Sequence, residues 1–134
     1  MKSENQIKVL VVDDEPSVCE TLRDYLEDYG YTVSAAGNSG EAMAILEKEL
    51  HDVALIDMRL PLMNGDALVL KAHELQPALR FLIHTGSSVF HLPEELRRIG
   101  IRGEHVFLKP VRDLSLLRNA IKSLVDPEME NGVN

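Results

Sequence analysis

Short apolar runs alternate along the chain with longer segments of helical period. Residues 53–56, Val-Ala-Leu-Ile, are apolar without alternation, which is typical of a strand buried on both faces of a parallel sheet. Five segments are predicted to be strands: residues 7–12, 31–36, 53–56, 80–84 and 106–108.

Amphipathic segments follow these strands and predict five helices. Pro16 is placed to begin the first helix and Gly30 to end it, and Asn38 with Glu41 forms a capping-box pattern before the second. The second helix is expected to bury Ala42, Ile45, Leu46 and Leu50. The remaining helices are predicted at residues 66–75, at 93–99 with Pro93 in the first turn, and around Leu114, Leu117, Ile121 and Leu124.

Strands that alternate with helices predict an α/β fold of one domain. The usual solution at this length is a doubly wound, flavodoxin-like parallel sheet of five strands in the order 2-1-3-4-5. We expect this domain to span residues 1–125 and an acidic, flexible tail to span residues 126–134.

Polar residues stand where four of these strands end. Asp13 and Asp14 follow the first strand, Asp57 closes the third, Thr85 follows the fourth and Lys109 the fifth. Each residue alone has a structural explanation, such as a turn, a cap or an exposed lysine. Together they are predicted to meet at the carboxyl edge of the sheet, where open α/β folds bind ligands.

This combination predicts phosphoryl chemistry. Carboxylates close together raise one another's pKa unless a cation lies among them, and an open site with oxygen ligands favours Mg²⁺. With such a cation, an Asp57 oxygen can attack phosphorus and form an acyl phosphate, while Thr85 and Lys109 hold phosphoryl oxygens. The bond between Lys109 and Pro110 is a candidate for cis geometry.

Composition narrows the classes of partner. The net charge of −8 argues against nucleic acid as the main partner. The absence of an apolar run near ~18 residues and the polar N-terminal residues predict a cytoplasmic protein without a membrane segment. Cys19 is the only cysteine, so no internal disulfide can form, and its position favours packing.

Charge is unevenly distributed along the chain. Residues 1–57 hold 4 basic and 13 acidic groups, a net charge of 4 − 13 = −9, whereas residues 97–122 hold 7 and 2, a net charge of 7 − 2 = +5. Both regions can be plain solvated helix faces. Alternatively, the basic part is a surface for a homodimer or an acidic downstream partner, and the acidic first helix meets a kinase.

The sequence resembles the receiver domain of two-component response regulators over about residues 7–125. The resemblance rests on Val-Val-Asp-Asp-Glu-Pro at 11–16, Asp-Met-Arg-Leu-Pro-Leu-Met-Asn-Gly at 57–65, Thr-Gly at 85–86 and Lys-Pro at 109–110. It implies that Asp57 accepts a phosphoryl group from a histidine kinase or a histidine phosphotransfer protein. It also implies that Mg²⁺ binds to Asp14, Asp57 and the backbone carbonyl of Arg59, with Asp13 assisting through water. Thr85 and Lys109 would read out the phosphoryl group through the fourth and fifth strands and helices.

Two features depart from the family pattern. The aromatic switch position, three residues before Lys109, holds Val106, and Phe107 is expected on the opposite face of its strand. The segment between Thr85 and Lys109 is about two residues longer than expected, with the excess in residues 87–92. Output is therefore expected to depend on reordering of this loop, with Phe90 or His91 as the moving group.

Three functional alternatives remain open at the level of the sequence. The first is a stand-alone receiver that acts as a phosphorylation-dependent interaction module or relay intermediate, because the nine residues after Val125 (134 − 125) are too few for an output domain. Such a receiver is expected to be a phosphoacceptor with self-catalysed phosphotransfer rather than an enzyme. The second is a small Mg²⁺-dependent phosphatase or phosphotransferase with an aspartyl-phosphate intermediate. The third is a pseudo-receiver that binds partners without phosphorylation. Arg59, two positions beyond Asp57, is expected to alter access of the hydrolytic water to the acyl phosphate.

Overall fold

The computed structural model describes residues 6–61 and 63–126 and contains the predicted five-stranded parallel sheet. Its strands are β1 (Lys8–Val12), β2 (Thr32–Ala36), β3 (Val53–Asp57), β4 (Arg80–Thr85) and β5 (Val106–Leu108). They run in the order β2-β1-β3-β4-β5, which confirms the predicted topology.

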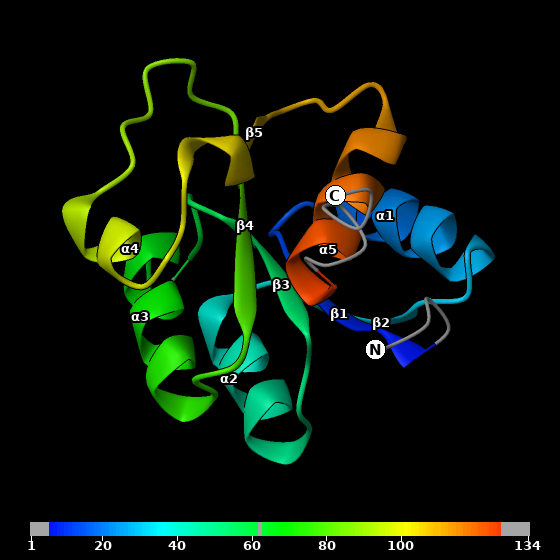
Figure 1. Ribbon diagram of the computed structural model, residues 1–134, viewed down its shortest axis with the longest axis horizontal. Helices are drawn as coiled ribbons and strands as arrows, with labels where there is room; N and C mark the ends of the chain where they lie inside the picture. Colours follow the sequence, from blue (N-terminus) through cyan, green and yellow to red (C-terminus); the bar gives the residue numbers. More distant parts are fainter. Residues whose placement is uncertain (1–5, 62, 127–134) are drawn as a thin grey trace, which may run out of the picture.

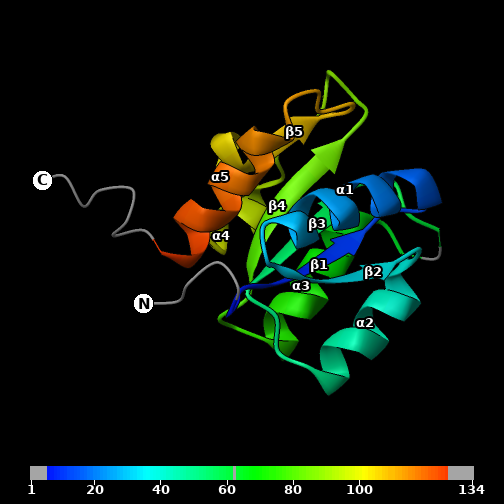
Figure 2. The ribbon, with the colours of Figure 1, turned by 90° about the vertical axis from the view of Figure 1, so that its right-hand side faces the viewer.

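The predicted helices are also present. They are α1 (Pro16–Asp28), α2 (Ser39–Lys48), α3 (Gly65–Leu75), α4 (Glu94–Arg98) and α5 (Leu114–Val125). A 3-10 turn at Gly103–His105, which the sequence did not predict, precedes β5. Figures 1 and 2 show α1 and α5 on one face of the sheet and α2, α3 and α4 on the other.

Each face of the sheet has its own apolar core. Alternate strand residues such as Leu10 and Ile56 pack with Leu68 of α3, while Val11 and Leu55 pack with Leu117 of α5. Strands buried on both faces explain the unbroken apolar runs in the sequence. The sheet therefore lies between two layers of helices, which hold the ends of its central strands in place.

Two details of the helices differ from the sequence prediction. Leu50 was expected in the buried stripe of α2, but α2 ends at Lys48 and Leu50 is 77% exposed. Pro93 is the N-cap of α4 rather than part of its first turn. The Asn38 cap is confirmed, because its side chain accepts a hydrogen bond from the Glu41 backbone N–H.

Two further predictions concern the ends and surfaces of the chain. Of the expected tail at residues 126–134, only Asp126 lies within the described residues, and it is the buried C-cap of α5. No helix within residues 6–61 and 63–126 combines the length and apolarity that crossing a bilayer requires. Cys19 is a buried free thiol, as packing rather than reactivity predicts, and burial raises its pKa.

A pair of leucines on either side of the end of α2 tests this core. Leu46 is 3% exposed, so Leu46→Ala should lower the free energy of unfolding by about 3 kcal/mol, because it leaves a cavity between α2 and the sheet. Leu50→Ala should change it by less than about 0.5 kcal/mol. Urea denaturation measures both values, and equal losses would contradict the described end of α2.

Candidate functional site

The register of the strands brings the predicted site residues to one edge of the sheet. Val12 pairs with Ile56, Asp57 pairs with His84, and Thr85 pairs with Leu108. Asp13 and Lys109 each follow directly after one of these pairs. Four neighbouring strands therefore end side by side, as the order of the strands predicted.

The alternation of side chains decides which of these residues share a face. Val11, Leu55 and Leu82 belong to the core beneath α1 and α5. Side chains two positions along a strand return to the same face, so Asp13, Asp57 and His84 continue those three rows. Thr85 continues the row of Ile83, which packs toward α3 and α4.

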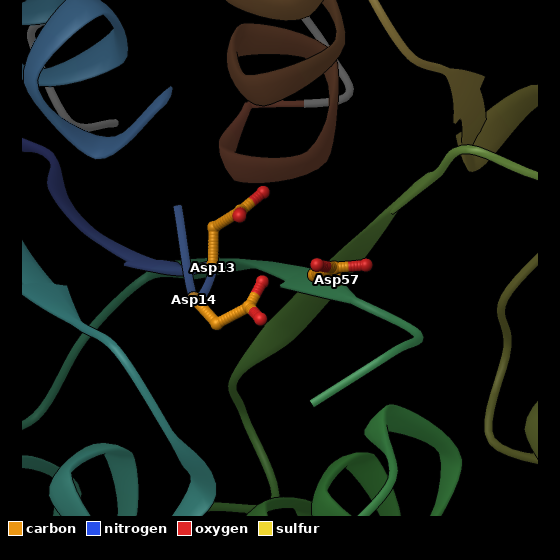
Figure 3. A group of neighbouring side chains, drawn as sticks. All are labelled: Asp13, Asp14 and Asp57. Carbon is orange, nitrogen blue, oxygen red and sulfur yellow. The ribbon is translucent and has the colours of Figure 1, made fainter. Parts of the chain in front are cut away.

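Three carboxylates gather at the ends of β1 and β3. Asp13, Asp14 and Asp57 each offer an oxygen within 4.8 Å of the others, and Figure 3 shows the three side chains together. Asp13 is 2% and Asp57 4% exposed, whereas Asp14 is open to solvent. An open cleft of about 610 Å³ adjoins them, and Asp14, Asp57, Arg59, Thr85 and Lys109 are among its lining residues.

Lys109 joins the acidic groups. Its Nζ lies 2.7 Å from Oδ2 of Asp13, 3.1 Å from Oε1 of Glu15 and 3.2 Å from Oδ2 of Asp57. Burial by itself would lower the pKa of Lys109, but the three carboxylates raise it overall, so the ammonium stays charged. Lys109 thus balances part of the negative charge that these strand ends bring together.

Asp57 is fixed from two sides. Its Oδ1 accepts a hydrogen bond from the Arg59 backbone N–H at 3.1 Å, and its Oδ2 accepts one from Lys109. Burial raises the pKa of Asp57, and the nearby charge of Asp13 raises it further, while both hydrogen bonds lower it. An additional cation would favour the ionised, nucleophilic form of this carboxylate.

Thr85 connects the site to the loop at residues 86–93. It is buried, its Oγ1 accepts a hydrogen bond from the Ser87 backbone N–H at 3.2 Å, and its carbonyl accepts one from the Lys109 backbone N–H at 2.7 Å. The bond between Lys109 and Pro110 is cis, as predicted. Arg59 is exposed at the mouth of the cleft.

Sequence reasoning missed His84, which lies beside the acidic cluster. Its side chain is 6% exposed, and its Nδ1 is 3.9 Å from Oδ2 of Asp13. Burial, helped by the charge of Lys109, lowers the pKa of His84 to about 4, so its imidazole is neutral at pH 7. Alternation within the strand predicts that positions 84 and 85 face opposite sides, but only the register of β3 and β4 shows that His84 rather than Thr85 shares the face of Asp57.

The donor set fits a hard divalent cation. The cluster offers carboxylate oxygens only, without a thiolate, and Asp14 keeps one side of it open to water. The buried Oδ2 of Asp13 already lies against a positive charge, that of Lys109. The residues therefore suit Mg²⁺ better than a soft metal.

Comparison with known proteins agrees with this geometry. The response regulator receiver domain family matches residues 9–122. Sporulation initiation phosphotransferase F of Bacillus subtilis is 29% identical over 115 residues, which are 86% of this chain and 90% of that protein. The alginate biosynthesis transcriptional regulatory protein AlgB of Pseudomonas aeruginosa is 36% identical over 86 residues, 64% of this chain, and the match spans only 19% of AlgB.

Solved structures share the fold over nearly the whole chain. A CheY-like receiver domain protein from Methanospirillum hungatei has a TM-score of 0.73 at 30% identity and covers 92% of this chain and 98% of its own. A response regulator protein from Burkholderia pseudomallei, with a phosphorylated aspartic acid, a calcium ion and citrate, has a TM-score of 0.75 at 26% identity. The match covers 95% of this chain and 74% of that one.

Gly65 provides a test of the loop that carries Asp57 into α3. A Cβ at this position would lie 2.7 Å from the Cα of Met58 and would also collide with the Asp57 carbonyl oxygen. Gly65→Ala should therefore displace the backbone and lower the free energy of unfolding by about 2 kcal/mol. Gly103→Ala is the matched control, because nothing lies near its added Cβ. Thermal unfolding of both variants measures the difference, and an unaffected Gly65→Ala would disprove this close contact.

Proposed function

The chain belongs to the response regulator receiver family, and from this premise we propose that it accepts a phosphoryl group on Asp57. The observation that carries the proposal is the setting of Asp57: a buried carboxylate at a strand end, held by Lys109 and the Arg59 N–H, and open to a cleft. The Burkholderia pseudomallei relative with its phosphorylated aspartic acid supports it. The donor would be a phosphohistidine on a sensor histidine kinase or a histidine phosphotransfer protein.

Asp13, Asp14, Asp57 and the Arg59 backbone carbonyl are proposed to hold Mg²⁺. When bound, the cation would neutralise charge on the carboxylates and on the incoming phosphoryl group. The transfer itself is proposed to take place between the donor histidine and Asp57. An Asp57 carboxylate oxygen forms a bond to phosphorus, the bond from phosphorus to the donor nitrogen breaks, and the histidine leaves with that electron pair.

Lys109 and Thr85 are proposed to recognise the bound phosphoryl group. The Lys109 ammonium, 3.2 Å from Asp57, needs only a short movement to reach an oxygen on phosphorus. The Thr85 hydroxyl can donate to another oxygen after rotating away from the Ser87 N–H. Arg59, which is exposed and lines the cleft, is proposed to limit the approach of water to the acyl phosphate.

Intact-mass measurement after incubation with Mg²⁺ and acetyl phosphate tests the acceptor. The protein should gain the mass of one phosphoryl group, whereas Asp57→Asn should gain none because an amide is not a nucleophile here. Glu47→Gln, at an exposed position of α2, is the matched control and should react like the unchanged protein. Chelation of Mg²⁺ with EDTA should abolish the gain.

Two results would contradict the proposal. A phosphoryl group that appears on Asp57→Asn would show a different acceptor. Continuous release of phosphate from many small phosphate esters per protein molecule would instead support the phosphatase alternative.

The conformational change that follows phosphorylation is proposed to pass from the site to α4 through the loop at residues 86–93. The Ser87 N–H donates to Thr85 Oγ1, and the Ser87 carbonyl accepts the Phe90 N–H at 3.2 Å. Phe90 packs against the apolar core beneath α3 and α4, and Val106 packs against the same core. Rotation of the Thr85 side chain about its Cα–Cβ bond would move Oγ1 away, break the first of these hydrogen bonds and loosen the turn that holds Phe90.

Phe107 does not suit the role of switch. It packs against the core beneath α1 and α5, on the face opposite to Val106, as strand alternation predicted. The signalling surface is therefore proposed to be the one formed by β4, α4, β5 and α5, with Phe90 as its moving aromatic group.

A neighbouring pair in the loop tests this route. In Phe90→Ala, phosphorylation of Asp57 should persist, but the phosphorylation-induced change in the Leu96 amide resonance should be largely lost, because α4 is no longer coupled to the loop. Val89→Ala, at a position 75% exposed, should behave like the unchanged protein. NMR spectra before and after phosphorylation give both answers, and a full Leu96 response in Phe90→Ala would refute the route.

The charged groups on two exposed surfaces are the basis for the proposed partners. The exposed acidic side chains of α1, which begins at the site edge, are suited to a kinase or phosphotransfer protein, and the exposed arginines of the basic part are suited to an acidic partner or a second copy. The exposed acidic residues are Glu20, Asp24, Glu27 and Asp28, and the exposed arginines are Arg97, Arg98, Arg102 and Arg112. Because phosphohistidine donors are charged from ATP, the cytoplasm is the proposed location.

A further inference from the structure

His84 lies where a receiver site needs exact placement of a carboxylate. It pairs with Asp57 across β3 and β4, and it shares the face of Asp13, Asp57 and Lys109. Its side chain is 6% exposed, and Nε2 is buried without a hydrogen-bond partner among the described residues. An apolar side chain could fill the same space in the core, so packing alone does not explain a polar ring at this position.

The surroundings of the ring indicate which nitrogen carries the proton. Asp13 Oδ2 is the acceptor that the structure places near Nδ1, at 3.9 Å, and no described group lies within hydrogen-bond distance of Nε2. A neutral imidazole has one N–H, and a buried donor without an acceptor is more costly than a buried acceptor without a donor. The Nδ1–H tautomer, directed at Asp13, is therefore the favoured one.

The Lys109 ammonium contacts Asp13 Oδ2, which is the oxygen that lies 3.9 Å from His84 Nδ1. The ammonium lies 2.7 Å from Asp13 Oδ2, and a divalent cation held at Asp13 would repel it from this oxygen whether or not a phosphoryl group is present. As the ammonium moves away, Asp13 Oδ2 loses its present partner, and His84 is the other group that the structure places beside that oxygen. A shift of about 1 Å brings Nδ1–H into hydrogen-bond range.

We propose that His84 is a positioning residue for Asp13: its Nδ1–H fixes the Asp13 carboxylate in the orientation in which it serves the divalent cation. The inference rests on the proposed function, because it concerns the same site. A donor behind a ligating carboxylate restrains its rotation and so strengthens metal binding without touching the metal. His84 does not touch the phosphoryl group, and its effect passes through Asp13.

Mg²⁺ affinity of the unphosphorylated protein measures this role. MgCl₂ titrations followed by amide NMR shifts should show that His84→Leu binds about tenfold more weakly than the unchanged protein, at the lower end of such effects. His84→Asn, whose side-chain amide places a donor near the position of Nδ1, should retain affinity within about threefold. His73→Leu in the last turn of α3 is the matched control and should leave the affinity unchanged.

A second measurement does not depend on metal affinity. Imidazole nitrogen-15 spectra at pH 7 should show the Nδ1–H tautomer for His84, and the Nδ1 resonance should shift on addition of Mg²⁺. Thermal unfolding of each variant, measured without Mg²⁺, identifies any variant that is not folded. The His84→Asn protein keeps the test valid if His84→Leu does not fold.

The outcomes separate this inference from the proposed function. Mg²⁺ binding that is equal in His84→Leu and the unchanged protein would overturn the role of His84 and leave the phosphoacceptor proposal intact. Equal weakening in the Leu and Asn variants would overturn it too, because the volume of the ring rather than its N–H would then matter. Observation of the Nε2–H tautomer in the nitrogen-15 spectra would also overturn the role of His84. Failure of the unchanged protein to bind Mg²⁺ would instead contradict the metal site itself.

Discussion

The contact of one ammonium group with three carboxylates is the interaction on which this site depends. The fold places Asp13 and Asp57 at neighbouring strand ends with little exposure to water, where like charges repel strongly. Lys109 reaches both of them and Glu15 from β5. Removing a partner from such a buried group leaves an uncompensated charge, so the positions of the acids and of Lys109 constrain one another.

The same contact suits the site to the proposed response. Lys109 has carboxylates on several sides, so in the proposed phosphorylated state an anionic oxygen on Asp57 would compete with Asp13 and Glu15 for it. Both faces of the central strands are packed, with Leu68 beneath one face and Leu117 beneath the other, whereas β5 at the edge of the sheet is only partly buried. Few backbone hydrogen bonds are described in the loop that follows Thr85 and α4 has only five residues, so the proposed movement passes into this loop.

Some sequence predictions failed at the ends of helices and strands. Leu50 fits the spacing of the α2 stripe, but the helix ends two residues earlier and the side chain faces solvent. Asp126 looked like the start of a polar tail, yet it caps α5 and is buried. The fourth strand was predicted to end at His84, but β4 extends to Thr85, and its register with β3 puts His84 on the face of Asp57. Spacing along the chain carries no information on where an element meets its neighbours.

The sequence by itself determined the alternation of strands and helices, the acidic residues at two strand ends and the hydroxyl and ammonium at two more, because apolar runs and turn residues are local properties of the chain. The strand order was predicted from the usual arrangement of such an alternation, and the pairing of the strands confirmed it. It also determined that Val106 and Phe107 face opposite sides, since alternation within a strand is fixed by backbone geometry. Only the tertiary structure decided that Lys109 bridges Asp13, Glu15 and Asp57, that Thr85 and Phe90 are linked through Ser87, and that His84 lies behind Asp13. These contacts join residues far apart in the chain or depend on loop geometry, so packing and register, not spacing, set their distances.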